Sequence, residues 1–486
     1  MPGRGFLSRK LDRRAFGTRR APTVPYRERI VRNVGGRRRF AGRSSRPKPA
    51  SQTGDDRVSA VAHEQPASAP AAAGPVARAA AAIEGLAVRT LLQPNERLSE
   101  LVGARVLLKR EDLQPVRSYK IRGAVNLLHS LTEQERQQGI VCASAGNHAQ
   151  GVALACAELG VRARIYLPRN TPRQKRDRVA QLGGDHVRLI LHGNTYDDAS
   201  KAAVLDASRT GATLAPAFDD PRVIAGQGTV VREVLQELGH APDILLVPVG
   251  GGGLLAGALL ALAEAPAEFG ADRCRVVGVE PTGAASLQAA LAAGRPLDLA
   301  EIDTFADGTA VRKVGEHPFE IIRNSGVEVV TVETGAICQE MLRLYQVDGI
   351  IAEPSGAMSM ADLENRGIAP GSTVVAILSG GNNDVSRYAE VIERALLHEG
   401  RKHYFLVEFP QEPGALRRFL QDILGADDDI TFFEYVKRNN REVGPALVGV
   451  ELGDPATFDA LLARAAASPL VVEALPADSP MLRYLI

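Results

Sequence analysis

Long apolar runs and paired cysteines are both missing from this chain of 486 residues. Apolar runs such as Ile244 to Val249 are far shorter than the roughly 20 residues that a membrane-spanning helix needs. The four cysteines lie far apart, without a C-x-x-C pair, and are Cys142, Cys156, Cys274 and Cys338. Because the apolar runs are short, we expect no transmembrane helix. The cysteine spacing excludes a disulfide framework and a zinc knuckle, so we expect a reducing, cytoplasmic location.

Two further signatures are absent. The N-terminus carries no apolar core or cleavage-like site typical of a secretory signal. The histidines show no metal-ligand spacing such as H-E-x-x-H, so we assign no metal. What is present is the composition of a globular enzyme, with 45% hydrophobic and 24% charged residues, enough to bury a large core in two or three units.

Charge is distributed unevenly along the chain. Residues 1–48 hold 16 Lys/Arg and only Asp12 and Glu28, a local net charge of 16 − 2 = +14, whereas the whole chain carries +1. Up to Ala82 the sequence is rich in Arg, Pro, Ser and Ala and lacks apolar periodicity. We expect residues 1–82 to be a disordered basic extension, either solvated or an over-long gene start. A nucleic-acid-binding arm is the less favoured alternative.

Between residues 83 and 400, short β-branched runs alternate with amphipathic stretches, which is typical of an open α/β sheet. Helices are expected at 124–131 and 149–159, where apolar residues recur at helical spacing. Strands are expected at 140–143, 161–167, 186–191, 244–249, 276–279, 327–332 and 373–378. More than 300 residues of this pattern predict two lobes with a cleft between them.

The last part of the chain, residues 401–486, forms a separate predicted unit. Its strands are expected at 404–409, 430–437, 446–452 and 471–475, and its helices at 413–424 and 456–467. That βαββαβ order is typical of a ferredoxin-like domain.

A lysine stands just ahead of the first predicted helix, in the sequence Ser118-Tyr119-Lys120-Ile121-Arg122-Gly123-Ala124. The positive end of a helix disfavours the charged form of an amine, and Schiff-base chemistry needs a neutral amine. Taken alone, such a lysine is more often a cation that faces solvent.

A second motif, Ser144-Ala145-Gly146-Asn147-His148, joins a predicted strand to a helix. Free backbone N–H groups at this junction, with a hydroxyl and an amide side chain nearby, suit a carboxylate ligand. An ordinary helix cap with a tight turn is the alternative interpretation.

A third motif follows the apolar strand 244–249 and consists of Gly250, Gly251, Gly252, Gly253 and Leu254. Consecutive glycines let backbone amides approach an anion at a helix N-terminus, so we expect a phosphate cradle. The segment is neither a Walker A loop nor a G-x-G-x-x-G dinucleotide fingerprint. A flexible turn is the alternative.

A fourth segment, Leu378-Ser379-Gly380-Gly381-Asn382, places a hydroxyl at the carboxyl edge of the sheet, where open α/β sheets bind ligands. Together, the four motifs closely resemble those of the fold-type II (tryptophan synthase β-like) pyridoxal-phosphate enzymes, in the family's order and approximate spacing. Within that group the chain is most similar to the biosynthetic threonine dehydratases (threonine ammonia-lyases), from Ile83 to the C-terminus.

The resemblance implies roles for individual residues. Lys120 would form the Schiff base with pyridoxal 5'-phosphate, and Asn147 would donate a hydrogen bond to the ring hydroxyl of the cofactor. Gly250 to Leu254 would hold its phosphate, and Ser379 would face the pyridine nitrogen. Ser144 and its neighbours would take the substrate carboxylate, and Asp307 to Ala310 resembles another active-site segment of the family.

The implied reaction converts L-threonine to 2-oxobutanoate and ammonia. The freed Lys120 amine abstracts the α proton, the cofactor acts as an electron sink, and the β-hydroxyl is expelled. As a hypothesis, a serine opposite the ring nitrogen, rather than a carboxylate, favours elimination. Some activity on L-serine is also expected.

The C-terminal unit contains Phe409-Pro410-Gln411-Glu412-Pro413-Gly414-Ala415-Leu416, which resembles the strand-to-helix corner of ACT-like domains. In this family the effector is isoleucine, the end product of the pathway that 2-oxobutanoate enters, and the assembly is a homotetramer. A purely structural role in assembly is the alternative.

Several other functions share parts of this pattern. Serine dehydratase, serine racemase and threonine synthase share the Schiff-base lysine and the glycine loop. A racemase would usually lack the regulatory domain, and a threonine synthase would need a second phosphate site that we do not find. A catalytically silent amino-acid sensor that acts on nucleic acid is a further alternative, and the intact Lys120 argues against it.

Overall fold

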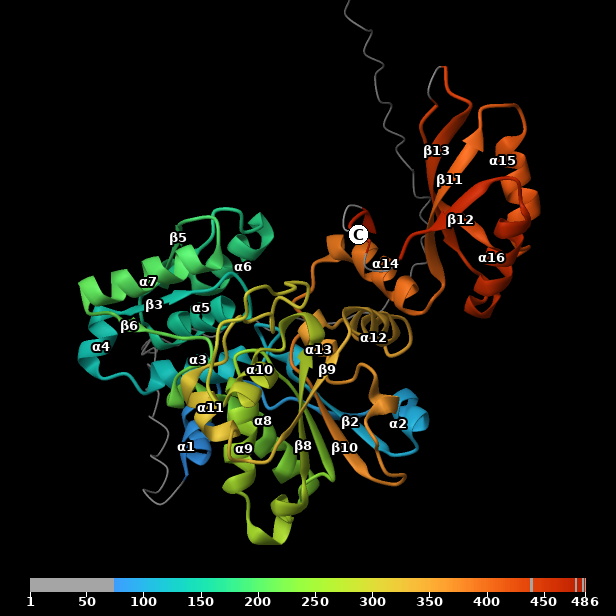
Figure 1. Ribbon diagram of the computed structural model, residues 1–486. Helices are drawn as coiled ribbons and strands as arrows, with labels where there is room; N and C mark the ends of the chain where they lie inside the picture. The colour runs from blue at the N-terminus through green and yellow to red at the C-terminus, as the bar shows by residue number, and fades with distance from the viewer. Residues whose placement is uncertain (1–73, 438–439, 477–478, 483–484, 486) are drawn as a thin grey trace, which may run out of the picture. The chain divides into compact units, whose positions relative to one another are not determined.

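Three β-sheets organise the protein in the computed structural model, which describes residues 74–437, 440–476, 479–482 and 485 (Figure 1). One has six strands in the order β1-β2-β10-β7-β8-β9, and a second has four strands in the order β5-β4-β3-β6. The third, near the C-terminus, has four strands in the order β12-β13-β11-β14. The first two sheets are the two predicted α/β lobes.

The six-stranded sheet is parallel except for β1 at its edge. Its strands are β1 (Leu92–Pro94), β2 (Arg105–Arg110), β7 (Ile244–Pro248), β8 (Arg275–Pro281), β9 (Glu328–Val332) and β10 (Thr373–Leu378). Every residue of β7 is buried, because a parallel strand covered on both faces needs apolar side chains throughout.

Side chains along β10 point alternately to the two faces of the sheet, and each face has its own hydrophobic core. Val374 and Ala376 pack with α2 (Glu96–Val102), α12 (Thr334–Gln346) and α14 (Tyr388–His398) on one face. Val375 and Ile377 pack on the other face with helices α8 (Pro221–Leu238), α9 (Gly253–Ala263), α10 (Ser286–Ala293) and α11 (Glu316–Ile322). The period of two follows from the pleat of the strand.

The four-stranded parallel sheet is the core of the other lobe. Its strands are β3 (Ile140–Ala143), β4 (Ala163–Leu167), β5 (Val187–Leu191) and β6 (Thr213–Leu214). The helices of this lobe are α3 (Lys120–His129), α4 (Glu133–Gln138), α5 (Asn147–Leu159), α6 (Arg173–Gly183) and α7 (Tyr196–Thr210). Apolar residues of α3 and α5 form one continuous core with β3 and β4.

The C-terminal sheet confirms the predicted βαββαβ unit. Its elements are β11 (Lys402–Pro410), α15 (Ala415–Arg418), β12 (Asp429–Tyr435), β13 (Val443–Glu451), α16 (Phe458–Ala467) and β14 (Val471–Ala474). All pairings are antiparallel, and β11 and β13 are the two central strands, as expected for a ferredoxin-like fold. A π-helical turn, Phe419–Ile423, continues α15, and Phe405 and Phe419 are buried in the core.

The prediction of disorder up to Ala82 is wrong for its last residues. Helix α1 (Pro75–Ala82) is well formed there, with Val76 and Ala79 buried. Both carboxylate oxygens of Glu264 accept hydrogen bonds at the start of the helix, from the backbone N–H of Val76 at 2.8 Å and of Ala77 at 2.9 Å. This cap comes from a residue 188 positions away, which local composition does not reveal. Residues 1–73 of the predicted extension lie outside the described residues.

All seven strands predicted for the catalytic region are present, with ends within two residues of the predictions. Strands β1, β2 and β6 were not predicted. Two of them have only two or three residues, and β2 carries Lys109 and Arg110, both of which are buried. The charged side chains of Lys109 and Arg110 interrupt the run of apolar residues on which strand prediction depends.

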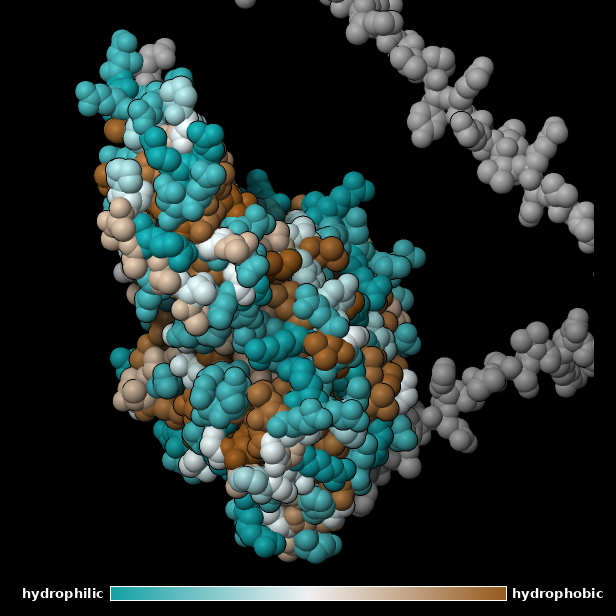
Figure 2. All heavy atoms as spheres, turned by 90° about the vertical axis from the view of Figure 1, so that its right-hand side faces the viewer, coloured by the Kyte–Doolittle hydropathy of each residue, from teal (hydrophilic) through white to brown (hydrophobic). Residues whose placement is uncertain are grey.

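Among the described residues, no helix is both long and apolar enough to cross a bilayer. On the face drawn in Figure 2, hydrophilic and hydrophobic residues are interspersed.

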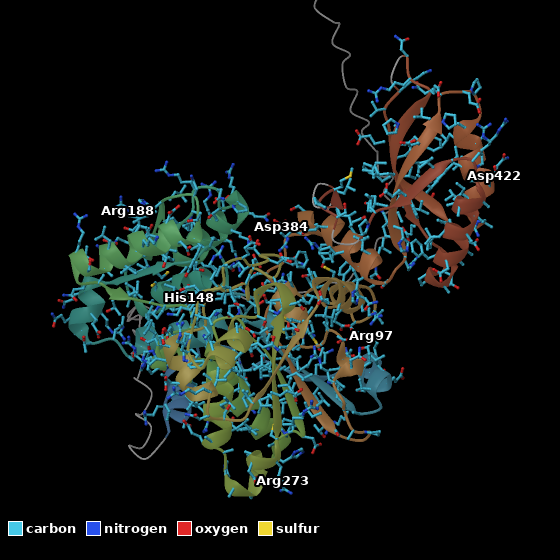
Figure 3. The ribbon with its side chains drawn as sticks, viewed as in Figure 1. Arg97, His148, Arg188, Arg273, Asp384 and Asp422 are labelled. Atoms are coloured by element: carbon cyan, nitrogen blue, oxygen red, sulfur yellow. The ribbon has the colours of Figure 1, made fainter. Side chains whose placement is uncertain are left out.

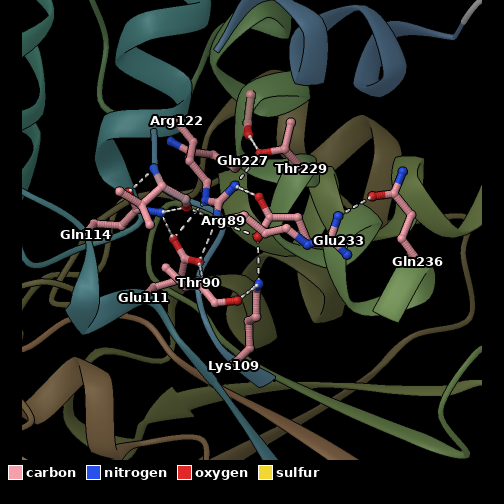
Figure 4. A network of polar contacts seen from close by, with 12 residues as sticks. Arg89, Thr90, Lys109, Glu111, Gln114, Arg122, Gln227, Thr229, Glu233 and Gln236 are labelled. Atoms are coloured by element: carbon pink, nitrogen blue, oxygen red, sulfur yellow. Dashed lines mark hydrogen bonds and ion pairs between the residues drawn. The ribbon is translucent and has the colours of Figure 1, made fainter. Parts of the chain in front are cut away.

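Helix α3 is fixed by a buried ionic network (Figure 4). The guanidinium of Arg122 is fully buried and donates to both carboxylate oxygens of Glu111 at 2.7 and 2.8 Å. It also donates to both oxygens of Glu233 on α8, at 2.6 and 2.9 Å, and Lys109 donates to Glu233 at 2.6 Å. Burial alone would raise the pKa of Glu111, but Arg122 reverses this and holds it below its usual value. The network joins α3 to β2 and α8.

Replacing Arg122 with methionine should destabilise the protein by about 3 to 5 kcal/mol, because Glu111 would keep a buried charge without its main partner. The measurement is the midpoint of urea unfolding at fixed protein and cofactor concentration. Arg173→Met is the control, since the Arg173 side chain is 86% exposed, and the change should stay within about 0.5 kcal/mol. Equal midpoints for the two variants would contradict the interpretation.

Candidate active site

Lys120 is the first residue of α3, which begins four residues before the predicted start at Ala124. Its amine Nζ donates to the backbone carbonyl of Ala217 at 3.1 Å and lies 5.1 Å from the centre of the Tyr119 ring. The backbone N–H of Tyr119 donates to the carbonyl of Ser379 at 3.1 Å. The lysine therefore lies next to the fourth motif, although 259 positions separate Lys120 from Ser379 in the numbering (379 − 120).

The glycine loop connects β7 to the N-terminus of α9. Gly252 has a φ of +87°, a conformation that favours glycine. A Cβ atom on Gly251 would lie 2.3 Å from the ring of Phe218, and one on Gly250 would lie 2.8 Å from Cα of Thr309. No side chain caps α9, so backbone N–H groups at its start are available to an anion.

Two consecutive residues connect the lysine to this loop. Ala217 accepts the hydrogen bond from Lys120, and Phe218 packs its ring against Gly251. Leu254, the last residue of the predicted cradle, is 2% exposed in the core. The amine and the glycine loop therefore lie close together.

Asn147 lies at the start of α5 and contacts two residues of the other lobe. Its Nδ2 atom donates to Oε1 of Glu353 at 2.6 Å, and its Oδ1 atom accepts from Nδ2 of Asn382 at 2.7 Å. Asn382 belongs to the fourth motif, so the second and fourth motifs meet as the resemblance implies.

Ser144 caps its own loop. Its hydroxyl oxygen accepts from the backbone N–H of Gly146 at 3.2 Å and of Ala149 at 3.3 Å. This is the helix-cap arrangement that the sequence left open as an alternative. A role for Ser144 in holding a substrate carboxylate stays a prediction.

Ser379 follows β10 and is 3% exposed. Its hydroxyl donates to the carbonyl of Ser355 at 3.1 Å, which leaves its oxygen lone pairs free to accept. Thr309, from the predicted segment 307–310, contacts the Ser355 hydroxyl at 3.2 Å and lies against Gly250. Asp307 forms an ion pair with Lys175 of α6 at 2.8 Å.

Sequence reasoning missed Glu353 and Ser355, which flank the start of the short helix α13 (Pro354–Ala357). Glu353 is 4% exposed. Burial, and then the charge of Asp307, raise the pKa of Glu353 to about 7, against the lowering effect of the hydrogen bond from Asn147. The Glu-Pro-Ser-Gly turn is the one local signal, and it predicts a loop but not contact with Asn147.

His148 lies inside the lobe of the four-stranded sheet, on α5 (Figure 3). It is buried, and its Nε2 atom lies 2.9 Å from the carbonyl of Ala215. Burial lowers the pKa of His148 to about 4, so the ring is neutral at pH 7. Within the part of the chain that the structure describes, no cluster of three or more potential ligands could hold a metal ion.

Two family models match the chain. Residues 83–380 match the model described as pyridoxal-phosphate dependent enzyme. Residues 393–485 match the C-terminal regulatory domain of threonine dehydratase.

Individual relatives agree with these matches. The L-threonine dehydratase biosynthetic IlvA of Mycobacterium tuberculosis is 56% identical over 434 residues, which cover 88% of this chain and 100% of the relative. The structure of the processed form of threonine deaminase isoform 2 from Solanum lycopersicum has a TM-score of 0.60 and 38% identity, and the match covers 66% of this chain and 90% of that one. Maize serine racemase has a TM-score of 0.59 and 30% identity, with 67% and 97% covered.

Gly251→Ala should weaken binding of pyridoxal phosphate about 10- to 100-fold, because the new methyl group would overlap the Phe218 ring and displace the loop. Fluorescence titration of the protein with the cofactor measures the dissociation constant.

The control is Gly239→Ala at the end of α8, where φ is +72° and no atom lies within 4 Å of the added Cβ. It should cost some stability through backbone strain and leave cofactor binding unchanged. If both variants bind the cofactor like the wild type, the loop is not the phosphate cradle.

Proposed function

The chain belongs to the pyridoxal-phosphate dependent enzymes and, among them, to the biosynthetic threonine dehydratases, and from this premise we propose that Lys120 is its catalytic base. The protein removes water and ammonia from L-threonine to give 2-oxobutanoate, the reaction that leads into isoleucine biosynthesis. The observation that carries the residue assignment is the contact of Lys120 with Ala217, next to the glycine loop.

The residues of the site fit the cofactor. The uncapped N-terminus of α9, with glycines at positions where a Cβ would overlap neighbouring atoms, suits a phosphate dianion. The Ser379 hydroxyl, which donates to the carbonyl of Ser355, can rotate to donate to a ring nitrogen, and Asn147 offers an N–H to a ring hydroxyl. When bound, pyridoxal phosphate supplies the electron-withdrawing group that makes the α proton of an amino acid acidic.

Side chains and backbone groups of the chain remove the α proton and bind the substrate. We assign removal of the α proton to the Lys120 amine, which starts the elimination of the β-hydroxyl. In this proposal the N–H groups of Ala145, Asn147 and His148 bind the substrate carboxylate. The N–H groups of Gly146 and Ala149 donate to the Ser144 hydroxyl, and that of Ser144 donates to the carbonyl of Tyr166. None of these contacts selects against L-serine, so slower turnover of serine is expected.

Lys120→Ala should abolish 2-oxobutanoate formation, with a loss of about 10²- to 10⁴-fold or more, since among the described residues no other amine is bonded to Ala217. The assay follows 2-oxobutanoate released from L-threonine by purified protein with added cofactor. Lys201→Ala, on the exposed side of α7, is the matched control and should be unaffected. Turnover by the Lys120 variant at the wild-type rate would contradict the assignment.

For the regulatory unit, residues 401–486, we propose isoleucine as the effector, with residues 83–400 as the catalytic unit. The ring of Phe409, at the strand-to-helix corner, lies 5.7 to 6.1 Å from the rings of Phe419, Phe433 and Tyr435, an apolar environment that suits a branched aliphatic side chain. A homotetramer and a cytoplasmic location complete the proposal. The location is supported by four free cysteines.

Isoleucine should lower the rate at limiting L-threonine by a factor in the range of about 5 to 150, the usual size of an allosteric coupling. Initial rates with and without L-isoleucine measure it, and D-isoleucine is the control, because the two enantiomers have equal hydrophobicity. Equal rates under all three conditions would leave the C-terminal unit with a structural role alone.

A further inference from the structure

A short chain of hydrogen bonds determines which way the Asn147 amide faces. Nδ2 of Asn382 donates both to the carbonyl of Val116 and to Oδ1 of Asn147, each at 2.7 Å. A backbone carbonyl can only accept, so the amide nitrogen of Asn382 must face it. The oxygen of Asn147 is therefore turned toward Asn382, and its nitrogen is turned toward Glu353.

Glu353 accepts the hydrogen bond at the other end of this chain, on the nitrogen side of the Asn147 amide. Its Oε1 accepts from Asn147 Nδ2 at 2.6 Å, a short hydrogen bond of the kind that a charged acceptor makes. The backbone N–H of Asn382 also bonds to Glu353, so the carboxyl group accepts from both asparagines. With one N–H of Asn147 directed at Glu353, one N–H remains for a ligand.

The surroundings of Glu353 are built for this contact. A Cβ atom on Gly380 would lie 2.2 Å from Oε1 of Glu353, so only glycine at that position lets the carboxyl group reach Asn147. The side chain does not cap its own helix α13. The nearest charges are Asp307 and Lys175, which pair with each other. The hydrogen bonds of the Glu353 carboxyl group are thus directed at Asn147 and at the backbone N–H of Asn382.

We propose that Glu353 is a positioning residue, which fixes the amide of Asn147 so that its remaining N–H meets the ring oxygen of the cofactor. The proposal rests on the role of Asn147 stated above. It predicts that Glu353 influences the cofactor through Asn147 alone.

A double-mutant cycle tests this prediction with Glu353→Gln, Asn147→Ala and the combined variant. A glutamine replaces one carboxylate oxygen with an NH₂ group and removes the negative charge, so it is a weaker acceptor for the two donors that face it. Glu353→Gln should weaken pyridoxal phosphate binding about tenfold and shift the visible absorption band of the bound cofactor. In the Asn147→Ala background the same change should alter neither quantity.

Glu340→Gln is the matched control. Glu340 is also buried, and burial raises its pKa to about 7 despite its hydrogen bond to Arg97, but it lies in a different ion-pair cluster, with Arg97 and Asp348. Arg97 keeps Asp348 as a partner at 2.7 Å, so this variant should fold and leave the absorption band and cofactor affinity unchanged.

The outcomes separate the two claims. A wild-type protein that binds no pyridoxal phosphate would overturn the proposed function itself. A wild type that binds cofactor, with Glu353→Gln equal to it or equally impaired in both backgrounds, would overturn only the role of Glu353. If Glu353→Gln fails to fold, Asn382→Ala takes its place, because it releases the oxygen of the same amide, and the same expectations apply.

Discussion

The guanidinium of Arg122 lies out of contact with water and is held by the carboxylates of Glu111 and Glu233. Removing these charges from water is costly, and only close, multiple hydrogen bonds offset the cost. Only a small range of distances and orientations therefore satisfies the cluster, which joins β2, α3 and α8 at one point. Since Lys120 lies two residues before Arg122, the same interaction fixes the position of the amine.

Close packing of helices around α3 adds a second constraint. A Cβ atom on Gly226 of α8 would lie 2.6 Å from the backbone oxygen of Arg122, and one on Gly151 of α5 would lie 3.1 Å from the backbone of Lys120. The two helices can approach α3 this closely only because they lack side chains there. The start of α3 is thereby held between both lobes, at the edge where the parallel strands β7 and β10 end. Ligands of open α/β sheets bind at such an edge.

The sequence by itself was sufficient for the elements and motifs that depend on local pattern. Buried parallel strands such as β7 are continuous apolar runs, and the C-terminal βαββαβ order follows from alternating periods. The glycine loop stands at a strand-to-helix junction and Lys120 at the start of a helix, where anion and amine chemistry is expected. The comparisons with relatives agree with the cofactor and the reaction. Each single strand, helix and motif among these features is encoded by residues that are close together in the sequence.

Only the tertiary structure decided the features whose partners are distant in sequence. Helix α1 is capped by Glu264, and Asn147 is oriented by Glu353, 206 positions away, so neither contact leaves a local signal. Strand β2 was missed because the sequence alone predicts that a lysine such as Lys109 is exposed. Only the structure shows the partner that lets it be buried. The physical reason is the same in each case: a buried polar group is stable only beside its hydrogen-bond partner, and the fold, rather than the local sequence, brings that partner into place.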